Sequence, residues 1–301
     1  MALVNADKTR MSHDQNSFAS CMRRLLNLVV AAVSASASSP TAASVADVLP
    51  RESRVPGGVA LVTVGPADAA RPAVTRDGAN LWTVKRGASW IAAVGLPLST
   101  VPGEHSVSVS RGDATQSVTF AVKEKRYPVQ HVTLKDNAMV EPPPEVIARI
   151  ETESAHIKTV RSNWRESATT NASFTLPAKG RISGRFGGSR VLNGKPRAPH
   201  AGLDVAIGTG TPVLSPGDGV VLDTGSYYFC GNAMFIDHGN GLISMFCHLS
   251  AYITKVGDSV SKGQAVARSG ATGRASGPHL HWSVYLNGVS VEPELFVNIK
   301  K

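Results

Sequence analysis

From about residue 177 onward the chain is a succession of short apolar runs separated by glycine-rich turns, and this pattern limits the fold more than any other feature. Apolar runs bounded by turn residues indicate strands. The pair Asn240-Gly241 stands between two such runs, which is a strong signal for a β-hairpin. Since residues 177–301 contain no long helical pattern, we expect an antiparallel β domain over 177–297.

Residues 55–125 carry a second β-like pattern, in which Gly, Pro and Asp separate short apolar runs at regular intervals. This spacing indicates a small sandwich-like β domain. Residues 126–176 are predicted to link the two domains. Within them, apolar side chains recur at nearly helical spacing from Ile147 to Trp164, which favours one amphipathic connecting helix. The predicted fold is therefore mainly β, with two β domains joined by one helix.

The first 37 residues have the layout of a secretory signal peptide. Residues 23–24 are both arginine, residues 25–33 form a short apolar stretch, and residues 35–37 offer the small-residue cleavage site Ala-Ser-Ala. The apolar stretch is too short to span a membrane. We therefore expect an exported chain, a linker over 38–54 after cleavage, and no transmembrane segment in the processed protein. An ordinary apolar helix is the alternative interpretation.

The chain is basic, with 31 Lys and Arg against 22 Asp and Glu and a formal net charge of +9. Such a balance favours acidic partners, for example nucleic acid, anionic lipid or an anionic cell-wall polymer. There is no dense Lys/Arg run and no aromatic-rich RNA motif, so the charge by itself does not choose among these partners.

The chain has 3 cysteines. Cys21 would be lost with the signal peptide, whereas Cys230 and Cys247 would remain. An exported pair can form a disulfide. In the predicted hairpin these two residues are not directly opposite each other, so the sequence leaves open whether they are bonded.

Histidines are concentrated in the C-terminal β region. Between residues 200 and 281 lie His200, His238, His248, His279 and His281. Because side chains alternate faces along a strand, His279 and His281 are predicted to point the same way, with Trp282 on the opposite, core-facing side. The same alternation places His248 on one face with Phe246 and Ser244.

Two histidines and one aspartate from this region would make a catalytic zinc site, with three protein ligands and one position open for water. His200 and Asp204, four residues apart in PHAGLD, lie where a loop enters a strand and both can reach one ion. No H-E-x-x-H motif occurs, and no Glu lies between residues 167 and 291. Histidine is therefore left for proton transfer. His238 adjoins the hairpin turn and is interpreted as structural, which leaves His248 and one member of the pair His279 and His281.

Several motifs occur in a fixed order: PHAGLD, FIDHGNGL, CHLS and SGATGRASGPHLHW, with FGGSR before them and VEPELF after them. With these motifs, residues 177–297 resemble the lysostaphin/LytM-type zinc metalloendopeptidases of bacterial cell walls. The resemblance implies an antiparallel β-sheet catalytic domain of the lysostaphin/duplicated-hybrid-motif type with a narrow groove. It also implies one Zn²⁺ per chain, bound by His200, Asp204 and His281, with His248 and His279 as the catalytic pair. Cys230 departs from the pattern, where a polar residue such as Asn is expected.

The resemblance further implies that a water activated by the metal attacks peptide cross-links of peptidoglycan. The region 55–125 resembles the N-terminal part of exported Gram-negative members, which implies a periplasmic or cell-envelope location. D-alanyl–diaminopimelate links are favoured over glycine bridges. The N-terminal region either covers the groove or only targets and spaces the catalytic domain.

The sequence is also compatible with three other functions. Some relatives have lost ligands and act as activators or wall-binding modules for other hydrolases, whereas this chain has all five residues. A second alternative is a set of histidines without metal. A third is a basic nucleic-acid-binding β protein, against which the predicted export and the lack of an aromatic stacking platform argue. The sequence leaves open the cross-link, the start at Met1 or Met22, the oligomeric state and the regulation.

Overall fold

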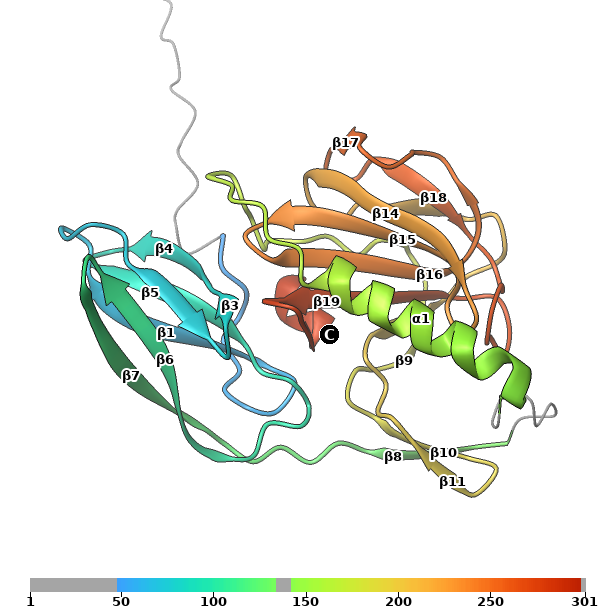
Figure 1. Cartoon of the computed structure of the whole chain (residues 1–301). Coiled ribbons are helices and arrows are strands. Elements are labelled where there is room, and N and C mark those ends of the chain that lie inside the picture. Colours follow the sequence, from blue (N-terminus) through green and yellow to red (C-terminus); the bar gives the residue numbers. More distant parts are fainter. Residues whose placement is uncertain (1–47, 134–141, 299–301) are drawn as a thin grey trace, which may run out of the picture. The chain divides into compact units, whose positions relative to one another are not determined.

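The computed structural model describes residues 48–133 and 142–298. Antiparallel strands dominate these ranges, which confirms the mainly β fold (Figure 1). The predicted signal peptide, residues 1–37, lies outside the described residues, as does most of the predicted linker 38–54. Within the described ranges, no helix is both long and apolar enough to cross a membrane.

The first β region consists of two antiparallel sheets with an apolar core between them. Its strands are β1 (Val59–Pro66), β2 (Ala73–Arg76), β3 (Ala79–Asn80), β4 (Trp82–Arg86), β5 (Ser89–Gly95), β6 (Gly103–Arg111) and β7 (Ala114–Val122). One sheet has the order β1-β5-β4 and the other β3-β2-β6-β7. Val62 of β1 packs in this core with Val107 and Phe120 of the second sheet. This is the sandwich-like region that the sequence predicted.

Strands β1 and β5 are covered on their second face as well. Val59 and Ile91 belong to the apolar cluster that contains Trp282. Burial on both faces explains why these strands have nearly continuous apolar runs instead of alternating ones. The end of the predicted linker packs on the same cluster, because Leu49 is buried there and the Arg51 N–H donates to a backbone carbonyl at 2.9 Å.

The connecting region contains the predicted helix, α1 (Pro144–Arg161), which begins with a proline. Proline is favoured at this position because the first helical N–H groups have no partner inside the helix. Val160 is the buried residue of the helix, Ile147 is exposed, and Trp164 lies beyond the helix end. The apolar stripe is therefore shorter and less buried than the sequence predicted.

A small sheet that the sequence did not indicate follows the order β11-β10-β8. Its members are β8 (Val129–Val132), β10 (Ser189–Leu192) and β11 (Lys195–Arg197). β8 pairs with β10 in parallel. It therefore ties part of the predicted linker 126–176 to the C-terminal region.

The C-terminal region carries the sheet that positions the histidines, with the order β17-β14-β15-β16-β19-β12-β9 (Figure 1). Three shorter strands join it, since β18 pairs with β13 and β16, and β20 pairs with β19. The bounds are β9 (Arg181–Gly184), β12 (Leu203–Ala206), β13 (Pro212–Leu214), β14 (Gly219–Tyr227), β15 (Gly231–Gly239), β16 (Leu242–Tyr252), β17 (Ser259–Val260), β18 (Ala265–Ser269), β19 (Leu280–Leu286) and β20 (Val289–Val291). A 3₁₀ helix spans Pro293–Phe296.

β15 and β16 form the hairpin predicted at Asn240-Gly241. Both turn residues have positive φ, 51° and 73°, as a tight hairpin turn requires. β16 then pairs with β19 in a register that sets Phe246 opposite Trp282. Leu280 and Trp282 are fully buried, which confirms the core-facing side assigned to β19. The opposite side of this strand pair faces the cavity that His248, His279 and His281 line.

Candidate metal centre and active site

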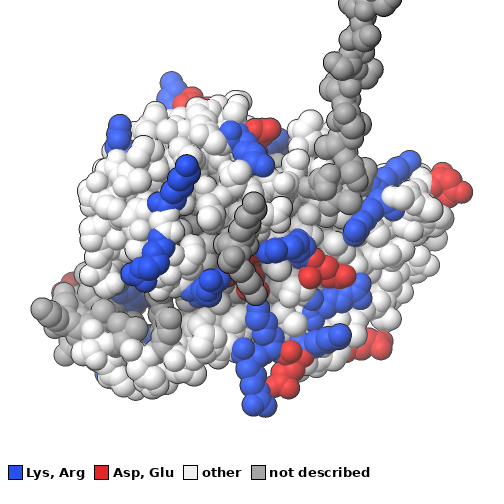
Figure 2. All heavy atoms as spheres, turned by 180° about the vertical axis from the view of Figure 1, so that it is seen from behind, with Lys and Arg blue, Asp and Glu red and all other residues white. Residues whose placement is uncertain are grey.

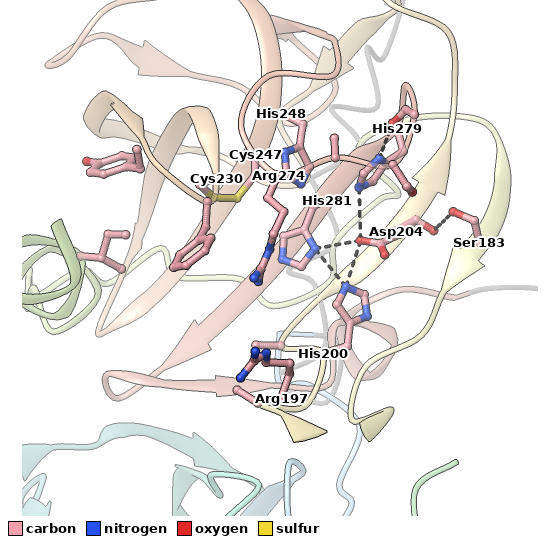
Figure 3. Close-up of a pocket in the computed structure, with 18 of the residues that line it drawn as sticks. Ser183, Arg197, His200, Asp204, Cys230, Cys247, His248, Arg274, His279 and His281 are labelled. Atoms are coloured by element: carbon pink, nitrogen blue, oxygen red, sulfur yellow. Dashed lines mark hydrogen bonds and ion pairs between the residues drawn. A yellow bond between two sulfur atoms is a disulfide. The ribbon is translucent and has the colours of Figure 1, made fainter. Parts of the chain in front are cut away.

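Three side chains with lone pairs meet where β12 and β19 pair. His200 lies in the loop before β12, and Asp204 in β12 stands opposite His281 in β19. Asp204 Oδ1 is 2.9 Å from His200 Nε2 and 2.8 Å from His281 Nδ1, and the two nitrogens are 3.0 Å apart (Figure 3). The structure thus brings together the three residues that the resemblance assigned to metal.

The outer partners of the two imidazoles determine which nitrogens carry protons when the rings are neutral. His200 Nδ1 lies 2.9 Å from the Arg185 carbonyl oxygen, which only accepts, so this nitrogen is the donor. Ser283 donates its own proton to the Ala201 carbonyl and therefore accepts from His281 Nε2, at 2.9 Å. Both inner nitrogens are left with a lone pair directed toward the carboxylate.

Three acceptors at such distances repel one another unless a positive charge lies among them. Glycine residues leave room for the side chains of this trio, His200, Asp204 and His281, on two sides. A Cβ on Gly184 would lie 2.4 Å from Asp204 Oδ2, and a Cβ on Gly202 would lie 2.6 Å from the His281 ring. Two imidazoles and one carboxylate form a donor set found in catalytic zinc sites. The residues present therefore fit Zn²⁺.

The Asp204 carboxyl group is held in its ionised form. Burial on its own raises the pKa, but hydrogen bonds and charge from His200 and His281, when either ring is protonated, outweigh burial. The pKa of Asp204 is consequently well below its usual range. Ionised carboxylate is the form that binds a metal ion.

His248 reaches the same cavity through a break in strand alternation. The sequence placed it on one face with Phe246 and Ser244, and this prediction is wrong. Phe246 is fully buried in the core, and Ser244 accepts a hydrogen bond from the Trp282 indole there. His248 has a φ of 62°, and the β15–β16 register shifts at this point. The resulting β-bulge turns His248 to the same side of the sheet as Cys247, which stands opposite His281.

His248 lies beside His279, with ring centroids 4.6 Å apart. Each ring donates its Nδ1–H to a backbone carbonyl, His248 to Thr272 at 2.7 Å and His279 to Gly277 at 2.8 Å. The Nε2 atom of each neutral ring is then the acceptor. His279 Nε2 is 3.9 Å from Asp204 Oδ1. Both rings are therefore placed to take a proton from a group bound at the trio.

The pKa of His248 is lowered to about 4, chiefly by burial and also by the neighbouring His281 and His279, whereas its hydrogen bond to the Thr272 carbonyl acts in the opposite direction. At neutral pH the His248 ring is thus uncharged. Its Nε2 can accept a proton, as a general base requires.

All five predicted side chains line one cavity of about 810 Å³. Ile150 and Ile157 of α1 form part of another wall. Among the described residues, none from 55–125 lines this cavity. Arg197 and Arg274 also line it, and neither was predicted as a site residue from the sequence (Figure 3). A signal was present, because Arg197 precedes His200 by three residues and Arg274 falls inside the motif SGATGRASGPHLHW.

A disulfide between Cys230 and Cys247 forms a further part of the cavity wall (Figure 3). The sequence left this pairing open because the two residues are not directly opposite in the hairpin. The turn before β15 nevertheless brings their Cα atoms to 5.0 Å. The Cys230 carbonyl also accepts the His248 N–H at 2.8 Å. The bonded pair therefore holds the bulge that directs His248 into the cavity.

His238 lies apart from this cavity, in agreement with its interpretation as structural. Its Nδ1–H donates to the Asp218 carbonyl at 2.8 Å, and its Nε2 accepts from the Ser244 hydroxyl at 3.0 Å. The ring packs against Phe174, with centroids 4.6 Å apart. Both ring nitrogens of His238 thus form hydrogen bonds inside the core.

Comparison with protein families gives two matches on this chain. Residues 198–293 match the model of Peptidase family M23, and residues 52–125 match the model of the Peptidase family M23 N-terminal domain. A Pseudomonas aeruginosa protein assigned to peptidase M23, with a crystal structure, is 36% identical. The alignment covers 81% of this chain and 95% of that chain, with a TM-score of 0.68.

Two curated relatives are similar over part of this chain. Peptidoglycan DD-endopeptidase ShyA from Vibrio cholerae is 42% identical over 116 residues, which are 38% of this chain and 27% of that protein. DD-carboxypeptidase/endopeptidase Mpg from Neisseria meningitidis is 42% identical over 94 residues, which are 31% of this chain and 22% of that protein. The chain thus spans about a quarter of the length of these relatives.

Proposed function

This chain belongs to peptidase family M23, a metallopeptidase family, and from that premise we propose that it is a zinc-dependent endopeptidase that hydrolyses peptide cross-links of peptidoglycan. One observation carries the proposal: two histidines and one aspartate converge with their lone pairs, and two more histidines face the same cavity. The name of the relative ShyA, a peptidoglycan DD-endopeptidase, supports the substrate class.

In this proposal His200, Asp204 and His281 bind one Zn²⁺. The bound ion would supply Lewis-acid polarisation of the scissile carbonyl and activation of a water molecule for attack. The protein contributes the orientation of the ligands, because the Arg185 carbonyl and the Ser283 hydroxyl fix the two imidazoles from outside.

His248 and His279 handle protons and charge. An acceptor Nε2 on either ring takes the proton of the attacking water. A ring that has become protonated then donates to the oxygen that gains negative charge, or to the leaving amine. Both rings are fixed by hydrogen bonds from Nδ1 to backbone carbonyls, so little reorientation is needed. The equivalent hydrogen bonding of the two rings supports a shared role.

Export and a cell-envelope location, in the periplasm, belong to the same proposal and are supported by the signal-like residues 1–37. The charge of the molecule supports an anionic wall as its partner. Figure 2 shows Lys and Arg side chains spread over the face it presents, with fewer Asp and Glu among them. D-alanyl–diaminopimelate links, rather than glycine bridges, are the proposed cross-links.

The test is digestion of defined peptidoglycan preparations by the zinc-loaded chain, with mass spectrometry of the released fragments and metal content measured on the same sample. We expect cleavage of peptide cross-links with about one zinc per chain. The alternative function, a non-catalytic activator of another hydrolase, predicts no fragments from the purified protein but faster cleavage when that hydrolase is present.

We also propose that the region before residue 170 restrains access to the groove. The support comes from α1, since Ile150 and Ile157 line the cavity. A truncated chain that begins near residue 170 should hydrolyse cell wall faster than the mature chain. Because truncation also removes contacts of Val160, the variant Ile150→Ser in the full chain serves as a second measurement. If both the truncated chain and Ile150→Ser keep the activity of the mature chain, the region before residue 170 does not restrain access to the groove. A targeting or spacing role would then remain for it.

A further inference from the structure

Two arginines flank the groove beside the metal trio. Arg197 ends β11, just before the loop that carries His200, and Arg274 lies in the loop between β18 and β19. Figure 3 shows the Arg274 side chain running past His281 and ending on the same side of the site as Arg197. Both side chains line the cavity and are half-buried. They lie on the opposite side of the trio from His279 (Figure 3).

The Arg274 guanidinium group is held in place by its surroundings. Its backbone N–H donates to the Phe229 carbonyl at 2.9 Å, and its guanidinium carbon lies 4.2 Å from the centroid of the Phe229 ring. Stacking of this kind fixes the plane of the guanidinium while its N–H groups stay directed outward from the ring edge. A planar guanidinium with a fixed orientation binds carboxylates in a bidentate manner.

The described lining of the cavity includes groups that can bind an anion. Among the described residues that line the cavity, Arg197 and Arg274 carry fixed positive charge, and Glu153 and Asp204 are acidic. Glu153 is already engaged, because it pairs with Arg149 at 2.6 Å and accepts the backbone N–H of Tyr228 at 2.7 Å. Asp204 belongs to the metal trio. Each guanidinium carries several N–H donors, so a substrate carboxylate on this side of the groove can accept hydrogen bonds from positively charged groups.

We propose that Arg197 and Arg274 bind a substrate carboxylate located next to the scissile amide, an inference that rests on the proposed peptidase function. In a cross-link between D-alanine and diaminopimelate, the carbon that bears the scissile nitrogen also bears a carboxylate. A glycine bridge has no carboxylate at this place. The two arginines thus select cross-links in which the leaving amine is part of an amino acid with a free carboxyl group.

The experiment compares two synthetic cross-linked peptides that are identical except that this carboxylate is free in one and a carboxamide in the other. For the zinc-loaded full chain, kcat/KM should be about 10- to 100-fold higher for the free carboxylate, as expected for hydrogen bonds to a charged group. Arg274→Gln and Arg197→Gln should each lower kcat/KM for the carboxylate peptide by much of this factor. The same variants should change kcat/KM for the carboxamide peptide only a little. Arg274→Lys, which keeps the charge but not the bidentate geometry, should be intermediate.

Arg268→Gln is the matched control, because it removes the same charge from β18, outside the cavity lining, and should keep the wild-type ratio. The proposal is overturned if the wild-type chain shows no preference for the carboxylate. Equal losses on both peptides would also overturn it, since they would indicate a structural role for the arginines.

Binding to the metal-free full chain, measured by calorimetry with the same two peptides, separates this inference from the proposed function. If neither peptide is hydrolysed but tighter binding of the carboxylate form is lost in Arg274→Gln, the anion subsite stands and the peptidase proposal fails. If both peptides are hydrolysed at equal rates and bound equally, the peptidase proposal stands and the subsite is wrong.

Discussion

His238 and His248 lie on opposite faces of the β15–β16 hairpin and share most of their properties. Both side chains are buried, both donate Nδ1–H to a backbone carbonyl, and burial lowers the pKa of each to about 4. The difference is at Nε2. In His238 this atom accepts from the Ser244 hydroxyl inside the core, whereas His248 lines the cavity beside His279.

Burial and a lowered pKa therefore do not by themselves identify a catalytic histidine. Both follow from desolvation, which acts equally on a structural ring and on a reactive one. What distinguishes the reactive ring is an acceptor nitrogen that faces space open to substrate. Substitutions of the site residues and of His238 test this distinction.

Removal of a proposed metal ligand should have the largest effect. His281→Ala or His200→Ala leaves two protein ligands, so zinc affinity should fall sharply and turnover should fall beyond the roughly 10⁴-fold expected for a lost proton-transfer group. Metal content and cell-wall hydrolysis are measured on the same folded samples. His105→Ala, outside the C-terminal region, is the control and should change neither.

Removal of His248 or His279 should separate chemistry from metal binding. The zinc content should stay near one ion per chain. Turnover should fall about 10²- to 10⁴-fold, which is the usual contribution of a positioned proton-transfer group. The alanine variants are assayed as above. If His279→Ala loses zinc while His281→Ala keeps it, the roles of the two β19 histidines are the reverse of those proposed.

Loss of the Cys230–Cys247 disulfide should have a moderate effect, because it acts on His248 only through the bulge. Cys230→Ser and Cys247→Ser should each lower kcat/KM about 10- to 100-fold, as expected when a reactive group is misplaced by about 1 Å. Zinc content should not change. Since either substitution breaks the same bond, the double variant should be no worse than the singles. Wild-type activity in both singles would show that the bulge holds without the bond.

His238 should have the smallest effect on turnover and a clear effect on stability. Its folded pKa of about 4 is below the ordinary 6.5, so the unfolded chain binds the extra proton between these values. The stabilisation, up to about 3 kcal/mol in the free energy of unfolding, is complete above pH 6.5 and is lost as the pH falls toward 4. Denaturant unfolding across this range should show a weaker pH dependence in His238→Asn than in the wild type. An identical pH dependence in the variant and the wild type would contradict the lowered pKa assigned to His238.

Much of the fold could be predicted because its signals are local. Glycine and asparagine at Asn240-Gly241 specify a tight turn through their tolerance of positive φ. The alternation from Leu280 to Leu286 correctly identified the core-facing side of β19. The helix was found, although its apolar stripe was overestimated, because helical spacing shows which side chains share a face but not what covers them.

The site was identified largely through motif resemblance, and the structure then brought the five residues to one cavity. Alternation by itself failed at His248, because it assumes an unbroken strand. Arg197 and Arg274 were not singled out, since both lie at or beyond strand ends, where periodicity carries no information about direction. The same limit applies to Cys230, which precedes β15 in a turn.

The sequence by itself determined the mainly β fold and the hairpin, and its motifs singled out five residues that share one cavity in the structure. The fold and the hairpin follow from short-range chemistry, namely turn preferences and strand alternation, whereas the five residues were singled out by motif resemblance. Only the tertiary structure decided which face His248 occupies, that Cys230 and Cys247 are joined, and that two arginines flank the groove. These features depend on contacts between segments far apart in the chain: a register shift opposite β15 sets the bulge, and loops from separate strands meet at the cavity.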